Sequence, residues 1–81
     1  MKIKKLSKTT YEIEIKDDLI YVSKEKNPNT RDLYIYFIDI FSSVGENEVQ
    51  WGENFDDFDN VVDYIQDNFN IPDNIINQIK L

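Results

Sequence analysis

The stretch DLYIYFIDIF, residues 32–41, is apolar at nearly every position, and it decides how the rest of the chain is arranged around it. Successive side chains of a strand point to opposite faces of a sheet. Here both alternating sets are apolar, with Leu33, Ile35, Phe37 and Phe41 on one face and Tyr34, Tyr36, Ile38 and Ile40 on the other. Strands buried on both faces have this pattern, so the sequence predicts a central strand. Asp39 interrupts the first set and needs either a cation, for which Arg31 or a lysine is the candidate, or a place at the rim of the sheet.

Shorter strands are predicted on both sides of this stretch. Residues 10–16, TYEIEIK, alternate between apolar and charged side chains, which is typical of a strand with one buried face. Asp17 and Asp18 then make a tight turn into LIYVS, so residues 10–23 predict a β-hairpin. KIKKL, residues 2–6, is expected to be a short edge strand whose lysines discourage pairing with another chain. EVQW, residues 48–51, predicts a short last strand that Gly52 ends, and KEKNPNTR, residues 24–31, predicts the longest loop.

From Asn54 onward the apolar period changes to 3.6, which predicts a helix. Its apolar side chains lie within a stripe of about 100°, the width expected of a helix packed on a core. They are Phe58, Val61, Val62, Ile65 and Phe69. Asp56 or Asn54 is the expected cap, and Trp51 is expected to anchor the junction between sheet and helix. NIPDNIINQIK, residues 70–80, predicts a second short helix that Asn70 caps, with inward-facing side chains at Ile75, Ile76 and Ile79.

Together these patterns predict an α+β protein, with a small antiparallel sheet of four or five strands and two C-terminal helices packed on one face. The 81 residues are expected to form a single domain, residues 1–81, with the sheet in residues 1–51 and the helical part in residues 54–81. No stretch approaches the roughly 20 apolar residues of a membrane span, and no signal peptide is visible. The protein is therefore expected to be cytoplasmic, with no membrane partner.

The composition excludes most catalytic and metal chemistry. The chain has no cysteine and no histidine. A disulfide framework or zinc ribbon is therefore not expected, and the commonest acid–base group and the thiol nucleophile are both missing. The stretch DDFDNVVDYIQD, residues 56–67, lacks the glycine and the final glutamate of a calcium loop. The sequence thus predicts a protein that is not an enzyme and that uses no metal or cofactor.

The net charge of −7 is concentrated in the second half of the chain. Residues 1–40 contain eight Lys and Arg against seven Asp and Glu, a balance of +1, whereas residues 41–81 contain Lys80 against nine acids, a balance of −8. Nucleic-acid binding needs clustered cations, so direct binding to nucleic acid is not expected. The expected partner is a protein with a basic groove, because complementary potential steers encounter and sets specificity.

The acids of the predicted first helix gather on the side opposite its apolar stripe. They are Asp56, Asp59, Asp63 and Asp67, and the preceding turn and strand are expected to extend the same surface with Glu46, Glu48 and Glu53. Like charges at i,i+4 spacing cost a helix about 0.2–0.5 kcal/mol per pair. One interpretation is a solvated face. The other is a surface that presents carboxylates about 6 Å apart to a groove built for phosphates.

In size, acidity and residue usage the chain resembles small phage or plasmid inhibitors that act as nucleic-acid mimics, such as some anti-CRISPR and anti-restriction proteins. The resemblance concerns general character and rests on no motif. It implies a non-enzymatic inhibitor that engages a basic nucleic-acid-binding surface of its target. Two alternatives stay open: an immunity or antitoxin partner of a toxin, and a self-associating accessory subunit, with a homodimer formed through the face of Tyr34 and Tyr36 or through an edge strand. The tyrosine surface requires that face of the strand to be open, whereas burial under the second helix or the N-terminal segment removes it.

Overall fold

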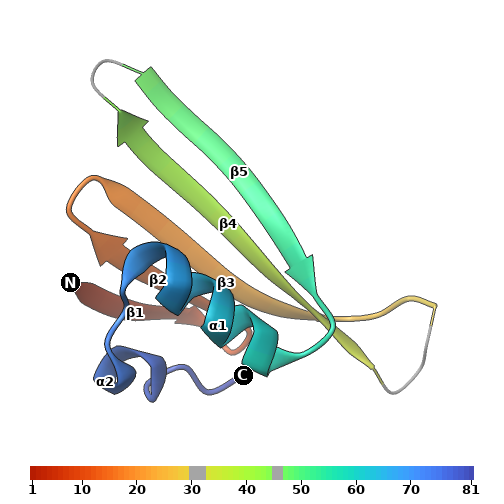
Figure 1. Cartoon of the computed structure of the whole chain (residues 1–81). Helices are drawn as coiled ribbons and strands as arrows, with labels where there is room; N and C mark the ends of the chain where they lie inside the picture. Colours follow the sequence, from red (N-terminus) through yellow and green to blue (C-terminus); the bar gives the residue numbers. More distant parts are fainter. Residues whose placement is uncertain (30–32, 45–46) are drawn as a thin grey trace.

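The computed structural model describes residues 1–29, 33–44 and 47–81, with the backbone alone at residues 43, 44 and 47. Five strands precede two helices along the chain (Figure 1). The elements are β1 (Lys2–Ser7), β2 (Thr10–Ile15), β3 (Asp18–Lys26), β4 (Tyr34–Val44), β5 (Asn47–Phe55), α1 (Phe58–Phe69) and α2 (Asp73–Ile76). The predicted α+β class is confirmed, and the helices follow the strands as expected.

The sheet is a meander in which each strand pairs with its neighbours in the sequence. The strand order is β1-β2-β3-β4-β5, and every pairing is antiparallel. β4, the doubly apolar stretch, lies inside the sheet between β3 and β5. Ile13, Ile20 and Ile40 lie opposite one another in a single cross-strand row. Cross-strand apolar rows of this kind stabilise a sheet, so the row fixes the register of β2, β3 and β4.

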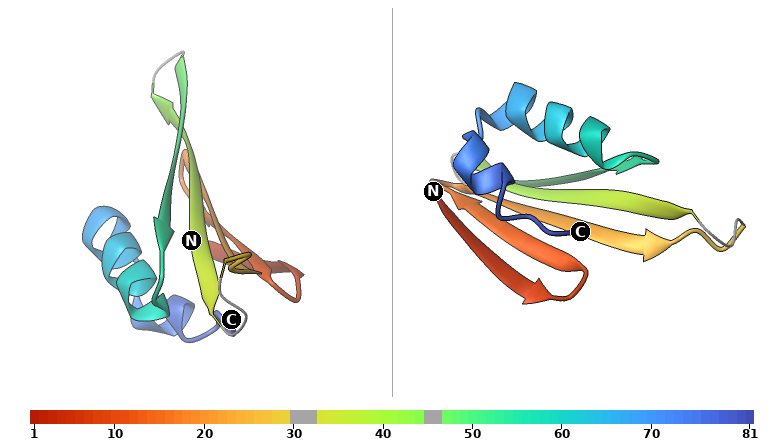
Figure 2. Two further views of the ribbon diagram at one scale, coloured as in Figure 1. Left: turned by 90° about the vertical axis from the view of Figure 1, so that its right-hand side faces the viewer. Right: turned by 90° about the horizontal axis from the view of Figure 1, so that it is seen from below.

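Both helices lie on the same side of the sheet (Figure 2). α1 contacts β4 and β5, and its buried side chains are Val61 and Ile65. The buried residues of the described chain form one apolar cluster between helices and sheet: Tyr11, Ile13, Ile20, Val22, Ile38, Ile40, Val61, Ile65, Ile71, Ile75, Ile76 and Ile79. The side chains predicted to face inward in residues 70–80, Ile75, Ile76 and Ile79, are all in this cluster. The predicted helix over these residues is shorter, because α2 covers only Asp73–Ile76 and Ile79 lies beyond it. Ile71, just before that helix, also belongs to the cluster and was not predicted.

The last strand is longer than the sequence predicts. Gly52 does not end it, because β5 continues to Phe55 and Gly52 pairs with Asp39 on β4. A Cβ at Gly52 would lie 3.0 Å from Asp39 Oδ1 and 3.1 Å from the Ile38 carbonyl oxygen. The glycine therefore permits a close approach within the sheet rather than a turn. β3 likewise extends to Lys26, so part of the predicted loop is strand, and residues 30–32 of that loop lie outside the described residues.

The helix caps also differ from the predicted ones. The N-cap of α1 is Asp57, whose carboxylate accepts a hydrogen bond of 2.9 Å from the Asp59 amide. Asn70 caps no helix start. It ends α1 in the left-handed conformation, with φ 53°, and its amide donates to the Gln66 carbonyl. Asparagine tolerates this conformation better than most residues, which explains its place at the turn between the helices.

Replacing Asp57 with alanine is expected to lower the free energy of unfolding by about 1 kcal/mol, because the Asp59 amide loses its acceptor at the exposed end of α1. Urea denaturation followed by circular dichroism measures the change. Asp56→Ala is the matched control, since Asp56 is also acidic and exposed but makes no capping bond. It is expected to change stability by less than about 0.5 kcal/mol. Equal losses in the two variants would contradict the cap assignment.

Candidate protein-binding surfaces

The outer side of α1 carries a row of carboxylates, which we call the acidic face and define as Asp59, Asp63 and Asp67. All three are exposed, and they follow one another at i,i+4 spacing, about 6 Å apart along the axis. No basic residue lies in the last turn of α1. Asp56 is exposed just before the helix cap. The structure therefore places the four predicted helix acids on or beside one solvent-facing surface.

The glutamates expected to extend this surface do not stay together. Glu53 pairs with Ile38 on β4, so it lies on the helix-bearing side of the edge strand β5. Glu48 pairs with Ser43, near the other end of β5 and on the opposite side of the sheet. Both are exposed. Glu46 lies outside the described residues. The expectation of one continuous acidic surface is thus wrong for Glu48, because side chains alternate between the faces along a strand.

The face of Tyr34 and Tyr36 is not the open face. Tyr36 packs against the core, and its ring lies 5.6 Å from that of Phe58 on α1. Tyr34 is 39% exposed near the start of β4, with the Lys24 ammonium 4.0 Å from its ring centroid. Ile38 and Ile40, on the same face, are fully buried. The core and α1 therefore cover most of the face of these two tyrosines, and Tyr34 is the one of the pair that stays exposed.

Trp51 lies on the helix side, as predicted for an anchor of the junction between sheet and helix. Its indole Nε1 donates to the Tyr64 hydroxyl of α1 at 3.3 Å. The ring of Phe55, four residues further along β5, packs against the same tyrosine ring, with the ring centroids 5.4 Å apart and the planes tilted by 52°. These contacts join the edge strand to the helix, so the acidic face is held on a helix with contacts on both β4 and β5.

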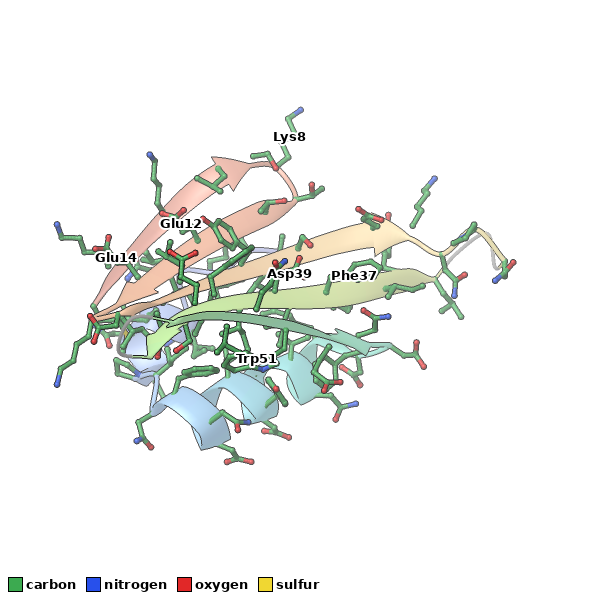
Figure 3. The ribbon with its side chains drawn as sticks, turned by 90° about the horizontal axis from the view of Figure 1, so that it is seen from above. Lys8, Glu12, Glu14, Phe37, Asp39 and Trp51 are labelled. Carbon is green, nitrogen blue, oxygen red and sulfur yellow. The ribbon has the colours of Figure 1, made fainter. Side chains whose placement is uncertain are left out.

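The open sheet face is the side of the sheet away from the helices, where Figure 3 shows the labelled Glu12, Phe37 and Asp39. The register places apolar, acidic and basic side chains there, and the basic ones are Lys2 and Lys4, opposite Glu14 and Glu12. The apolar ones are Leu19, Tyr21, Ile35, Phe37 and Phe41, and the acidic ones include Glu12, Glu14, Asp39 and Glu48. Phe41 is 40% exposed. The sequence separated the side chains of β4 into two alternating sets, but it did not show which set faces away from the helices.

A hollow of about 410 Å³ lies at one end of the open sheet face. Its lining includes Asp17, Leu19, Tyr21, Phe41, Glu48 and Gln50. The Tyr21 and Phe41 rings meet edge to face at 5.6 Å, with an interplanar angle of 88°. The hollow thus has aromatic walls with carboxylates around them. Sequence reasoning missed it because its residues come from three strands and a turn.

Tyr21 also has an acidic neighbour on β2. The Glu12 carboxylate lies opposite Tyr21 in the register. It raises the pKa of the Tyr21 phenol above the ordinary 10.0, mainly by accepting a hydrogen bond from the neutral phenol, with burial and charge repulsion acting in the same direction. Tyr21 therefore stays a neutral hydrogen-bond donor at physiological pH, beside a negative charge.

The described residues include no group of three or more acids, histidines or cysteines arranged to hold a metal ion. Within those residues no helix is long and apolar enough to cross a membrane. Comparisons with protein-family models, curated proteins and solved structures gave no match to this chain. The fold and its surfaces define an α+β protein with two candidate binding surfaces, the acidic face of α1 and the open sheet face.

Proposed function

We propose that this chain is a non-catalytic protein-binding module that inhibits its target by occupying a basic, nucleic-acid-binding groove. The observation that carries the proposal is the acidic face of α1, with three exposed carboxylates in a row and no basic residue in the last turn. Successive carboxylates lie about 6 Å apart, a spacing of several ångströms that is also that of phosphates along a nucleic-acid strand. Lysine and arginine side chains that bind phosphates would meet carboxylates at comparable intervals.

The local energetics of α1 favour a role for these acids beyond solvation. Each of the two i,i+4 pairs on the acidic face costs the helix about 0.2–0.5 kcal/mol, whereas a lysine at Asp63 would turn both pairs into favourable ones. Aspartate is also a poorer helix former than glutamate. The helix keeps its position through the buried Val61 and Ile65. Carboxylates that repel one another on a fixed helix are suited to bind a cationic surface, because the positive charges of the partner relieve the repulsion between them.

The proposal is tested by capture from a nuclease-treated bacterial lysate, with duplex DNA or RNA added afterwards as a competitor. We expect the native chain to retain a nucleic-acid-binding protein that the competitor displaces, and binding to weaken as salt rises. Asp63→Asn combined with Asp67→Asn is expected to weaken binding about tenfold at low salt, from the loss of two charge pairs. These two positions are chosen because Asp59 lies in the first turn, where its charge also stabilises the helix.

The matched control is Glu53→Gln combined with Asp73→Asn. Both residues are exposed and lie outside the acidic face and the open sheet face, and the change gives the same net charge of −5 from −7. It is expected to leave binding nearly unchanged. Equal weakening by the two double variants would show that total charge alone matters and would contradict the role of the acidic face. Retention of a partner that nucleic acid does not displace would favour an immunity or antitoxin role instead.

A further inference from the structure

The open sheet face combines apolar surface with carboxylates, which the acidic face of α1 does not. The hollow between Tyr21, Phe41 and Leu19 has apolar walls, and Asp17 and Glu48 are part of its lining. Its described lining contains no lysine or arginine. An exposed apolar surface edged by polar groups is typical of an interaction site. A partner side chain that fits this hollow therefore has an apolar part for the walls and a positive charge for the carboxylates.

A guanidinium or ammonium group satisfies both features of the hollow. Its charge pairs with carboxylates, and its flat or aliphatic part packs on aromatic rings, where a cation is attracted to the ring face. Arginine fits best, because it combines a stacking plane with several donors. The Gln50 side chain and the neutral Tyr21 hydroxyl provide further polar groups at the same end of the sheet.

The distribution of charge on the open sheet face also argues against a second copy of the chain as the occupant. The lysines placed on this face by the register, Lys2 and Lys4, lie on the edge strand β1, whereas Glu48 lies on the opposite edge strand β5. Asp39 and Glu12 lie between them. Lys2 and Lys4 of one copy meet Glu48 of another only when β1 lies over β5, and that arrangement also sets β2, with Glu12, over β4, with Asp39. Like charges that face each other at an interface are costly.

We propose that the open sheet face is a docking surface for a cationic segment of the partner, with an arginine side chain seated in the hollow formed by Tyr21, Phe41, Leu19 and Glu48. The inference rests on the proposed function in one respect, that the partner is a basic protein. It goes beyond that function by assigning recognition of an individual side chain to the sheet rather than to α1. The two surfaces face opposite ways, so they contact different parts of the partner.

The test uses the full chain labelled with ¹⁵N and a blocked peptide of alternating arginine and glycine. A twin peptide with citrulline in place of arginine has nearly the same shape without the charge. We expect the arginine peptide to shift the amide signals of Tyr21, Phe41 and Gln50, and the citrulline peptide to shift none of them. Glu48→Gln and Phe41→Ala are each expected to raise the Kd about two- to fivefold, as for an exposed ion pair or an exposed cation–aromatic contact.

Glu53→Gln is the matched control, because Glu53 is an exposed glutamate on the same strand but on the helix side of the sheet. Equal weakening by Glu48→Gln and Glu53→Gln would overturn the inference, and so would shifts confined to α1. The second result would leave the proposed function in place, since the acidic face would then be the binding surface. A dimer that Phe41→Ala dissociates would also overturn it. Absence of binding by the peptide would do the same, while the lysate capture decides the proposed function separately.

Discussion

Ile38→Ala is expected to lower the free energy of unfolding by about 2–5 kcal/mol, the range for removing a buried isoleucine side chain from a close-packed core. Ile38 is fully buried on the helix side of β4, where it belongs to the cluster that includes Val61 and Ile65. A domain of this size has a total stability of about 4–12 kcal/mol, so the loss is a large fraction of the whole. Denaturation in urea should show a lower midpoint with an unchanged slope.

The control for this prediction is Ile35→Ala, the same chemical change on the same strand. Ile35 lies on the open sheet face and is only partly buried. Truncation of Ile35 removes fewer contacts, and water can fill the space that is left. The free energy of unfolding is therefore expected to fall by about 1 kcal/mol or less. Similar losses for the two variants would contradict the assignment of the faces, because they would mean that both sides of β4 are equally covered.

The same pair of residues shows how far sequence reasoning reaches in this fold. The alternation of side chains along residues 33–41 places Ile35 and Ile38 on opposite faces of the sheet, because successive side chains of a strand point to opposite sides. It does not say which set meets the helices, since both sets are apolar. Asp39 is the available signal, because a carboxylate in one set and none in the other indicates the side facing solvent. A prediction based on Asp39 would have placed the side chains of Phe37 and Phe41 on the side of the sheet that faces away from the helices.

Boundaries were harder to predict than elements, for local reasons. From the sequence alone, Gly52 either ends a strand or allows a neighbouring group to approach the backbone closely. Its pairing with Asp39 on β4 shows that the second explanation is correct. Similarly, Asp56 and Asp57 are chemically equal candidates for a cap. The choice depends on where β5 stops, at Phe55, and thus on pairing with β4. Both errors come from contacts between segments that a local pattern does not contain.

The candidate surfaces divide in the same way. The acidic face of α1 was predicted correctly as a solvent-facing row, because a helical wheel depends only on the sequence of one element. The hollow on the open sheet face was not predicted, since it requires the strand order and register that bring Leu19, Phe41 and Gln50 side by side. Glu48 is an example. It was grouped with the helix acids because it is close to them in sequence, but its pairing with β4 places it on the open sheet face.

A chain that ends at Asn70 is expected to lose its cooperative fold. The deleted segment contributes four buried isoleucines to the core, Ile71, Ile75, Ile76 and Ile79, each at most 8% exposed. Burial of one such side chain is worth about 1.5–3 kcal/mol, so the four together amount to roughly 6–12 kcal/mol. That sum matches the whole stability expected of the domain, about 4–12 kcal/mol. Circular dichroism and amide dispersion in NMR spectra should show a chain without a sigmoidal unfolding transition.

The shorter deletion of Lys80 and Leu81 separates loss of the core from loss of chain length. Lys80 is exposed and Leu81 packs only partly against the core, so all four isoleucines stay in place. This variant is expected to unfold cooperatively, with a loss of about 1 kcal/mol from the partly buried leucine. A chain ending at Asn70 that kept a transition near the native midpoint would mean that α1 alone closes the core. The short α2 stabilises itself little, because a single turn gains few internal hydrogen bonds, so its isoleucines are the reason it holds its place on the sheet.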